Sequence, residues 1–336
     1  MTDSSHSHLA PKIRDKLTLP PKDRIQIMKR DVFVPYPLAT TALEYMDDLV
    51  NSPINDRPDN FMLTGMPGSG KTSVISRWQK IFDSPPNGNP TGAVIVSSIP
   101  GGGKTALMEQ VVLRNPQFST PPVDIKPVIR ITVPAGGRAD LITELLGSLG
   151  YDPERSAGLA SIRQARVYNG LDQCKTRVLI LDDINNLKEN RSGKISTAAW
   201  ETLKFIRVLS DKLRIHIIFT GDEASAEIVD QEDSLRTRMQ KVELEPWTDG
   251  EELARLLQGV EATLPLAEAS NIGERSRTSL VFKLGQQADR DGRAGRLYYL
   301  VKIPKKAGEL ALKRGLEHIE NVDLEKAAEW YGRRAS

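Results

Sequence analysis

Cysteine is almost absent from this sequence. Its single cysteine, Cys174, excludes an internal disulfide and fits a reducing compartment. No apolar run approaches the ~20 residues of a membrane span, and the N-terminus lacks the apolar core of a signal peptide. The net charge is only +2, so a nucleic-acid surface would have to come from a local cluster of basic residues. We therefore expect a cytoplasmic protein with no membrane partner.

The chain is long enough for more than one domain. Its 336 residues exceed the usual single-domain range, and 39% hydrophobic residues suffice for a sizeable core. After the Pro-Trp pair at 246–247 the strand signals disappear, and helical spacing is found at 250–258, 276–289, 296–313 and 323–331. We expect three parts: a basic arm over 1–30, a larger domain over 31–245 and a helical domain over 246–336.

A glycine-rich loop is the strongest functional signal. Residues 61–72 read FMLTGMPGSGKT, which fills the pattern G-x-x-x-x-G-K-[ST] between a predicted strand and a predicted helix. In such a loop, backbone N–H groups at a helix N-terminus cradle phosphate oxygens. We expect Lys71 to reach the β- and γ-phosphates of a nucleotide and the Thr72 hydroxyl to ligate Mg²⁺. The residues expected to bind the nucleotide are Gly65, Pro67, Gly68, Ser69, Gly70, Lys71 and Thr72.

A second glycine loop follows 33 positions later. Residues 94–111, VIVSSIPGGGKTALMEQV, align with residues 61–78, FMLTGMPGSGKTSVISRW, as a short internal repeat. Ser98 stands where the first copy has Gly65, and a Cβ is costly if that position needs a positive φ. This favours Lys71 over Lys104 as the working lysine. The shorter distance from Lys104 to the acidic strand described next argues the other way, so both stay candidates.

Two aspartates close a buried strand. Residues 177–183 read RVLILDD, an apolar run typical of a central parallel strand, and ligands sit beyond the carboxyl ends of such strands. We expect Asp182 to hold Mg²⁺ and Asp183 to orient or deprotonate the attacking water. Thr220 closes the next apolar run, 215–219, and is expected to touch the γ-phosphate or that water.

Arg238 is the candidate for a residue that acts between subunits. It has no carboxylate four residues away on either side, whereas Arg236 has Glu232. An arginine without a local partner can reach a phosphate in a neighbouring subunit as an arginine finger. A solvated arginine is the alternative interpretation.

Basic residues gather near both ends of the chain. Residues 12–30 carry a local charge of +5, which indicates a solvated arm or a contact with DNA or an acidic partner. His6 and His8 before them have the character of a loose tail. Residues 302–314 carry +4, and we expect their lysines to form a solvated helical face. Between these ends, Arg138 lies in a predicted loop, 134–140, that precedes a helix from Leu141.

The ordered motifs resemble those of AAA+ ATPases. The similarity is closer to the TniB/TnsC-type transposition ATPases, over nearly the whole chain from Asp31. The stretches that carry it are DVFVPYPLATTALEYMDDLV, VIRITVPAGGRADL, VLILDDINNLKENR, FTGDEASAEIV with LRTRMQKVELEPW, and GRAGRLYYLVKIPKKAGELALKRG. The resemblance implies an α/β fold: a P-loop NTPase of the AAA+ type, with a parallel core sheet and a C-terminal all-helical lid.

The resemblance also implies roles for single residues. Lys71 and Thr72 match the Walker A pair, Asp182 and Asp183 the Walker B pair, Thr220 the sensor-1 region, Arg238 the finger region and Arg296 sensor 2. AAA+ enzymes usually carry Glu where this chain has Asp183. Because aspartate is one methylene shorter, we expect slower hydrolysis.

The function implied is that of a Mg²⁺-dependent ATPase that regulates DNA transposition. Such proteins assemble on double-stranded DNA with ATP, as a homo-oligomeric ring or filament, and link a target-selection protein to a transposase, with hydrolysis driving disassembly. The loop with Arg138 matches the region that lines their DNA track. An initiator or clamp-loader-like replication ATPase, or a signalling NTPase that assembles without DNA, would use the same nucleotide residues, so these alternatives stay open.

Overall fold

The computed structural model describes residues 6–51, 57–83, 125–151, 159–187 and 196–335. The second glycine loop with Lys104 lies outside the described residues. The chain forms two compact units that are not continuous in sequence. The helical unit comprises Met1–Leu43, Thr64–Val74 and Val242–Ser336, and the sheet unit comprises Glu44–Leu63 and Ile75–Lys241. The first glycine loop therefore groups with the C-terminal helices.

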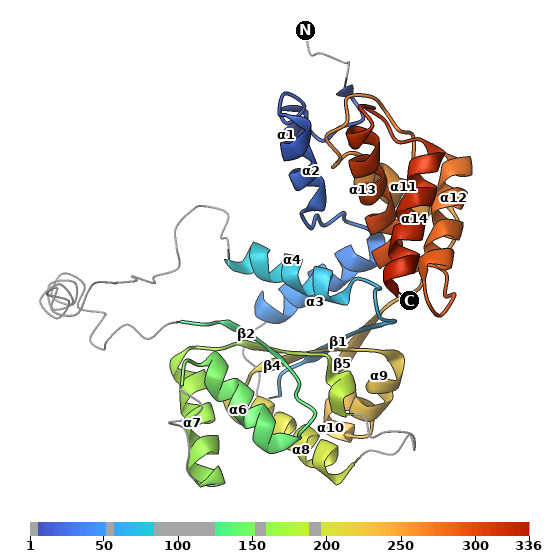
Figure 1. Cartoon of the computed structure of the whole chain (residues 1–336). Helices are drawn as coiled ribbons and strands as arrows, with labels where there is room; N and C mark the ends of the chain where they lie inside the picture. The colour runs from blue at the N-terminus through green and yellow to red at the C-terminus, as the bar shows by residue number, and fades with distance from the viewer. Residues whose placement is uncertain (1–5, 52–56, 84–124, 152–158, 188–195, 336) are drawn as a thin grey trace, which may run out of the picture. The chain divides into compact units, whose positions relative to one another are not determined.

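A five-stranded sheet is the centre of the sheet unit (Figure 1), with the last residues of β1 and β5 counted in the helical unit. Its strands are β1 (Asn60–Gly65), β2 (Val128–Thr132), β3 (Val178–Asp182), β4 (His216–Gly221) and β5 (Met239–Leu244), in the order β2-β3-β4-β1-β5. The pairs β2-β3 and β3-β4 are parallel. Every residue of β1, β3 and β4 is buried, as their apolar runs predict for strands covered on both faces.

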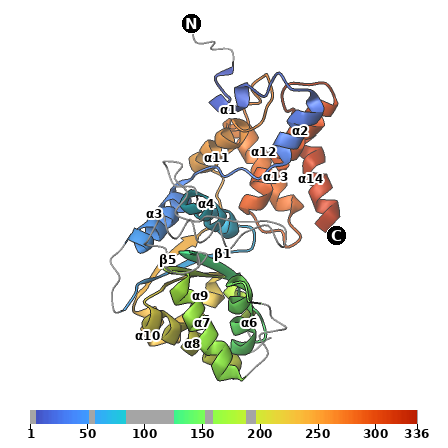
Figure 2. The same cartoon turned by 90° about the vertical axis from the view of Figure 1, so that its left-hand side faces the viewer.

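Three helices cover one face of this sheet (Figure 2): α6 (Arg138–Ser148), α7 (Ala160–Gln173) and α8 (Thr197–Leu213). Their apolar residues form one core with β2, β3 and β4, which includes Leu145, Leu171 and Phe219. The N-cap of α8 is Ser196, whose Oγ accepts a hydrogen bond from the Ala199 N–H at 3.0 Å. The short elements η2 (Ile184–Leu187), α9 (Glu223–Asp230) and α10 (Asp233–Arg236) complete the unit.

The helical unit contains α1 (Pro11–Arg14), α2 (Pro21–Lys29), α11 (Glu251–Glu261), α12 (Arg275–Ala288), α13 (Leu297–Lys313) and α14 (Asn321–Ala335). Helix α13 lies in the middle and packs against α2, α11, α12 and α14 (Figure 1). The four C-terminal helices predicted from the spacing are confirmed, with bounds shifted by a few residues. The two remaining helices, α3 (Pro37–Asn51) and α4 (Lys71–Asp83), each have residues in both units.

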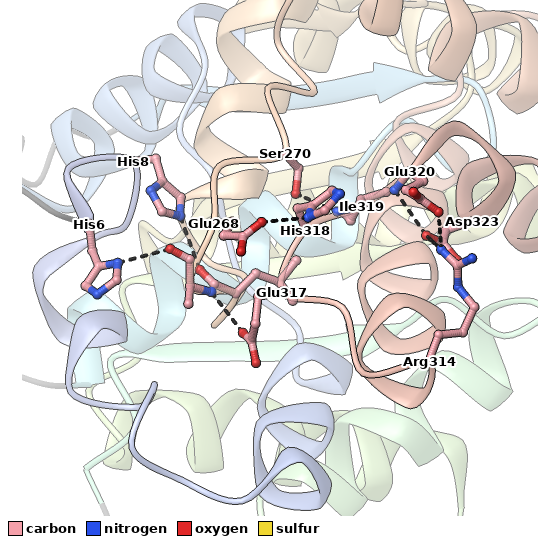
Figure 3. Close-up of polar contacts among 12 residues, drawn as sticks. His6, His8, Glu268, Ser270, Arg314, Glu317, His318, Ile319, Glu320 and Asp323 are labelled. Carbon is pink, nitrogen blue, oxygen red and sulfur yellow. Dashed lines mark hydrogen bonds and ion pairs between the residues drawn. The ribbon is translucent and has the colours of Figure 1, made fainter.

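The N-terminal segment packs on the helical unit through a few of its residues, and the prediction of a loose tail is wrong for residues from 6 on. Leu9, Ile25 and Met28 are buried in the helical unit. Arg24 is also buried, and its guanidinium donates to both carboxylate oxygens of Glu317, at 2.7 and 2.6 Å. His6 Nδ1 and His8 Nε2 form hydrogen bonds with the carbonyl oxygens of Ala267 and Leu266, at 3.0 and 3.2 Å; both histidines are labelled in Figure 3. Apolar residues interleaved with the basic ones anchor this segment to the helical unit, while every basic side chain of residues 12–30 except Arg24 is exposed.

Two further observations concern predicted segments. Helix α6 begins at Arg138 rather than Leu141, because Gly137, with φ of 84°, forms the turn that starts it. Among the described residues, no helix combines the length and the apolar character needed to cross a membrane.

Candidate nucleotide-binding site

The first glycine loop has the backbone that the motif requires. Gly65, Gly68 and Gly70 have φ values of 147°, 81° and 102°, which L side chains rarely adopt. A Cβ on Gly65 would lie 2.6 Å from Ser69 Oγ and 2.7 Å from the Leu244 carbonyl oxygen. The sequence favours this loop if its first position needs a positive φ, because the second loop has Ser98 there. Gly65 does have a positive φ.

The side chain of Lys71 folds back to the first residues of the glycine loop. Lys71 opens helix α4, and its Nζ donates to the carbonyl oxygens of Gly65 and Met66, at 2.7 and 3.2 Å. The ammonium group of Lys71 thus stays close to the glycine loop from which α4 starts. A cation beside the N-terminus of a helix is an arrangement that can bind a phosphate. Thr72 follows with an exposed side chain.

A cavity of about 270 Å³ opens beside the loop, within the helical unit. The loop and the start of α4 supply a polar wall, which includes Lys71 and Thr72. Residues before α3 and on α11 and α13 supply the rest: Asp31, Val32, Phe33, Val34, Tyr36, Leu256, Leu297, Tyr298, Val301, Lys302 and Lys305. A cavity that is polar at one wall and mostly apolar elsewhere suits a phosphate joined to a flat base.

Three polar atoms around the loop are buried without a hydrogen-bond partner among the described residues. They are the hydroxyl of Tyr36, Oγ of Ser69 and Nε of Arg296. Burial raises the pKa of the Tyr36 phenol to about 12, so this hydroxyl stays protonated and available as a donor. Buried polar groups are normally paired. Of these three, Tyr36 lines the cavity, and its unpaired hydroxyl fits a polar ligand there.

Helix α13 begins at the glycine loop. The Tyr298 N–H donates to the Gly68 carbonyl oxygen at 3.0 Å. Arg296, the N-cap of α13, forms ion pairs with Asp289 at 2.7 Å and Asp291 at 3.0 Å. The structure therefore brings the predicted Arg296 to the loop, with its guanidinium held by two carboxylates.

The predicted acidic residues lie in the sheet unit, at the end of β3. The Thr220 hydroxyl donates to Asp182 Oδ1 and accepts a hydrogen bond from the Asp183 N–H at 3.1 Å. Asp182 is 6% exposed, whereas the Asp183 side chain is exposed and its φ is 56°. The structure thus brings Asp182, Asp183 and Thr220 together, as predicted.

Sequence reasoning missed Arg130 at this site. Its guanidinium donates to Asp182 Oδ2, with Nε at 3.1 Å, and to Ser76 Oγ at 3.1 Å. A charged residue inside the apolar strand VIRITV was the available signal. Among the described residues, no group of three or more His, Cys, Asp or Glu could hold a metal. A Mg²⁺ ion here would need phosphate and water oxygens besides Asp182, which is its usual coordination in such sites.

The sequence also missed the apolar wall of the cavity. Val32 and Val34 lie far from Val301 in sequence, and none of the three belongs to a local motif that marks it as a ligand contact. The stretch DVFVPYP, apolar but without helical spacing, was the only signal. Chain folding that joins residues 31–36 to α13 creates this wall.

Arg238 is not free, so the premise of its prediction is wrong. Its Nη1 pairs with Asp211 at 2.9 Å, its Nε donates to the Ser234 carbonyl oxygen at 2.9 Å, and its side chain is 13% exposed. Arg236 is more exposed, at 57%, and pairs with Asp233. Asp211 lies on α8, 27 residues from Arg238 in sequence and far beyond the four-residue spacing of a local helical pair.

Arg138 is the first residue of α6 and has an exposed side chain. Its Nη2 donates to Gln164 Oε1 at 2.6 Å, and its guanidinium lies 5.2 Å from the centre of the Phe205 ring. The side chain is thus partly fixed on the surface of the sheet unit.

A match to a protein-family model identifies the family of this chain. Residues 24–101 and 79–249 match the model of the bacterial TniB protein, and these ranges include more than half of the chain. The chain belongs to the TniB family. Each of the two matches contains one complete glycine loop, as expected if the loop segment of this TniB-family protein is repeated. None of the curated protein sequences compared with it matches.

Solved structures show the same fold. The Aeropyrum pernix ORC2 protein, in ADPNP-ADP complexes, has a TM-score of 0.54 at 14% identity, over 91% of this chain and 71% of that chain. A. pernix ORC1 in complex with DNA has a TM-score of 0.51 at 14% identity, over 91% and 69%. Drosophila ORC bound to DNA has a TM-score of 0.50 at 13% identity, over 91% and 64%. The TniB-family protein therefore has the AAA+ P-loop ATPase fold with a parallel core sheet, as the sequence predicts.

Proposed function

We propose that this TniB-family protein is an ATP-switched regulator of DNA transposition. In this proposal it binds ATP, assembles on double-stranded DNA, links a target-selection protein to a transposase, and disassembles when ATP is hydrolysed. The observation that carries the nucleotide part is the cavity beside the glycine loop, whose lining includes Lys71, Thr72 and the unpaired buried hydroxyl of Tyr36. Family membership supports the transposition part.

Adenine and ribose would occupy the apolar part of the cavity, against Val32, Val34 and Val301. The phosphates would lie against the N-terminus of α4, where Lys71 exchanges its two carbonyl partners for phosphate oxygens. Gly65, Pro67, Gly68, Ser69 and Gly70 are proposed to shape that cradle. Arg296, which is held at the loop by Asp289 and Asp291, would sense the terminal phosphate.

Hydrolysis is proposed to use the residues at the ends of β3 and β4. Asp183 would accept a proton from the attacking water at its carboxylate, as the γ-phosphoryl group leaves ADP, and Thr220 would orient the site. Asp182 and the Thr72 hydroxyl are the residues that would hold Mg²⁺, which when bound neutralises charge that develops on the phosphate oxygens. The exposed position of Asp183 leaves its carboxylate accessible to water.

Assembly on DNA is proposed to place Arg138 against phosphates. Residues 135–139 are small apart from this arginine, so a DNA backbone can approach closely. For Arg238 to act as a finger on a neighbouring subunit, its guanidinium would have to exchange Asp211 for a phosphate. For the domain organisation we keep the division expected from the sequence. Residues 1–30 form the basic N-terminal arm, 31–245 the nucleotide-binding core and 246–336 the helical lid.

A binding experiment with random-sequence duplex DNA tests the proposal. The protein is incubated with a labelled duplex in the presence of ATP, ADP or no nucleotide, and a purified DDE transposase is then added. We expect DNA assembly that requires ATP and retention of the transposase on the assembled protein only. ATP binding without any effect of DNA would favour a signalling NTPase, and DNA assembly without transposase retention would favour a replication ATPase.

A further inference from the structure

A second hollow, of about 330 Å³, lies between α2, α13 and α14 of the helical unit. Four lysines and two aromatic residues make up most of its wall, with one carboxylate. The lining residues are Met28, Lys29, Lys302, Lys305, Lys306, Glu309, Trp330 and Tyr331. The sequence predicted that the lysines of α13 form a solvated face, and this is wrong for Lys305, which is 7% exposed.

The single carboxylate in the hollow is already neutralised. Glu309 is buried and pairs with Lys306 at 3.0 Å and with Lys313 at 2.6 Å. These two lysines lower the pKa of Glu309 through hydrogen bonds, against the opposing effect of burial. Glu309 therefore neutralises little of the positive charge of the other lysines in the hollow, and the net charge of the lining residues is positive.

Lys305 is the buried cation of this hollow. Its Nζ donates to the carbonyl oxygen of Arg30, and no carboxylate among the described residues is bonded to it. Asp31, whose negative charge acts on Lys305 in the opposite direction to burial, pairs with Lys302 at 2.8 Å. Burial and the charge of Lys302 lower the pKa of Lys305 to about 8. A buried ammonium that has only a carbonyl partner is costly, and an anion in the hollow would offset that cost.

The aromatic side chains add an apolar wall. The Lys306 ammonium lies 4.7 Å from the centre of the Trp330 ring, and the Tyr331 ring packs edge-to-face on Trp330 at 4.7 Å. Ammonium groups beside aromatic rings suit a ligand that joins a negative group to an apolar body. A carboxylate next to an aromatic or aliphatic side chain has this character.

We propose that this hollow binds an acidic segment of a partner protein, with a carboxylate reaching Lys305 and Lys306 and an apolar side chain against Trp330. Duplex DNA presents phosphates along a regular outer backbone, which exposed cations can reach. Lys305 is instead buried among three helices, where a single side chain or a chain end can enter. A hollow in which a buried ammonium group lies beside aromatic side chains thus fits a peptide better than a duplex.

The hollow shares Lys302 and Lys305 with the nucleotide cavity, so the two sites adjoin each other along α13. An acidic segment bound here would therefore change the charge that the nucleotide meets, and ATP would change peptide affinity by the same factor. This coupling rests on the proposed ATP binding, whereas peptide binding itself does not.

Fluorescence anisotropy of the full chain with a labelled ten-residue peptide of alternating Glu and Phe tests the proposal. We expect saturable, salt-sensitive binding that Lys306→Met and Lys305→Met each weaken at least tenfold. Lys326→Met is the matched control, because Lys326 is an exposed lysine of α14 that does not line the hollow; it should change affinity less than twofold. A thermal melt of each variant checks that it folds.

Three results would overturn the inference. The first is no saturable peptide binding, and the second is an equal loss of peptide affinity in Lys326→Met. The third is displacement of the peptide by a 20-base-pair duplex whose own binding Lys306→Met weakens. A repeat titration with ATP separates the two proposals. Peptide binding without any ATP binding would refute the nucleotide proposal alone. ATP binding that leaves peptide affinity unchanged would refute the coupling.

Discussion

Arg130 and Asp182 form an ion pair across two neighbouring strands of the sheet. Asp182 has one oxygen on this guanidinium and the other on the Thr220 hydroxyl, and its side chain is 8% exposed. A carboxylate this buried needs a counter-charge. Arg130 supplies it, at the residue proposed to hold Mg²⁺.

Removing Arg130 should therefore destabilise the protein strongly. In Arg130→Met, the carboxylate of Asp182 loses its cation, and we expect the free energy of unfolding to fall by about 3 kcal/mol, measured by urea denaturation. Addition of Mg²⁺ and ADP should recover part of the loss. Lys204→Met is the control, because its ion pair with Glu201 is exposed and should contribute under about 0.5 kcal/mol. Equal stability of Arg130→Met and wild type would contradict the role of this pair.

The first glycine loop should carry ATP binding. We expect Lys71→Ala to abolish binding in a nucleotide titration and Lys104→Ala to leave much of it. Unchanged affinity in Lys71→Ala would transfer the site to the second loop.

Replacing Gly65 by serine gives the first loop the residue that the second loop has. The positive φ and the 2.7 Å approach to the Leu244 carbonyl oxygen should make Gly65→Ser cost about 1–3 kcal/mol, seen as weaker ATP binding and a lower melting temperature. Gly147→Ser is the control, since an added Cβ there meets nothing within 4 Å. Tight ATP binding by Gly65→Ser would remove the argument against the second loop.

The two aspartates of β3 should have separate roles. Asp183→Asn should bind ATP with normal affinity and hydrolyse it at least tenfold more slowly, because the amide cannot accept the proton of water. Asp182→Asn should instead weaken the Mg²⁺ dependence of nucleotide binding. Titrations with and without Mg²⁺, together with turnover measurements, distinguish the two. Wild-type turnover in both variants would exclude this strand from catalysis.

Arg138 should contribute to DNA binding without sequence preference. Arg138→Ala should weaken assembly about equally on unrelated duplexes and flatten the salt dependence, since each lost phosphate contact removes about 0.9 from the slope of log K against log salt. ATP affinity should stay unchanged. Lys204→Ala, an exposed cation of the same unit, is the control. An unchanged salt slope in Arg138→Ala would place the DNA track elsewhere.

Arg238 should act across subunits. A mixture of Arg238→Ala and Lys71→Ala proteins should regain some ATPase activity if each site borrows an arginine from its neighbour, because a finger can contribute ~10³ or more in rate. Asp211→Asn, which loosens the partner of Arg238, should lower stability without abolishing activity. Mixtures that stay inactive at every ratio would argue that Arg238 only fixes α8 to its neighbours.

The sequence by itself determined the features that depend on neighbouring residues. The glycine loop, the apolar strands closed by Asp182 and Thr220, and the C-terminal helices follow from local spacing, since backbone conformation and strand burial are set mainly by a few adjacent side chains. Arg296 also lies at the loop, as the family resemblance implied.

Only the tertiary structure decided which charges are paired and which are buried. Arg130 meets Asp182, Arg238 meets Asp211 and Arg24 meets Glu317 over separations of 52, 27 and 293 residues. Lys305 is buried because α2 and α14 pack on its helix, not because of its neighbours in sequence. Ion pairing and desolvation depend on distances in space, and charge counted along the chain contains no such distances.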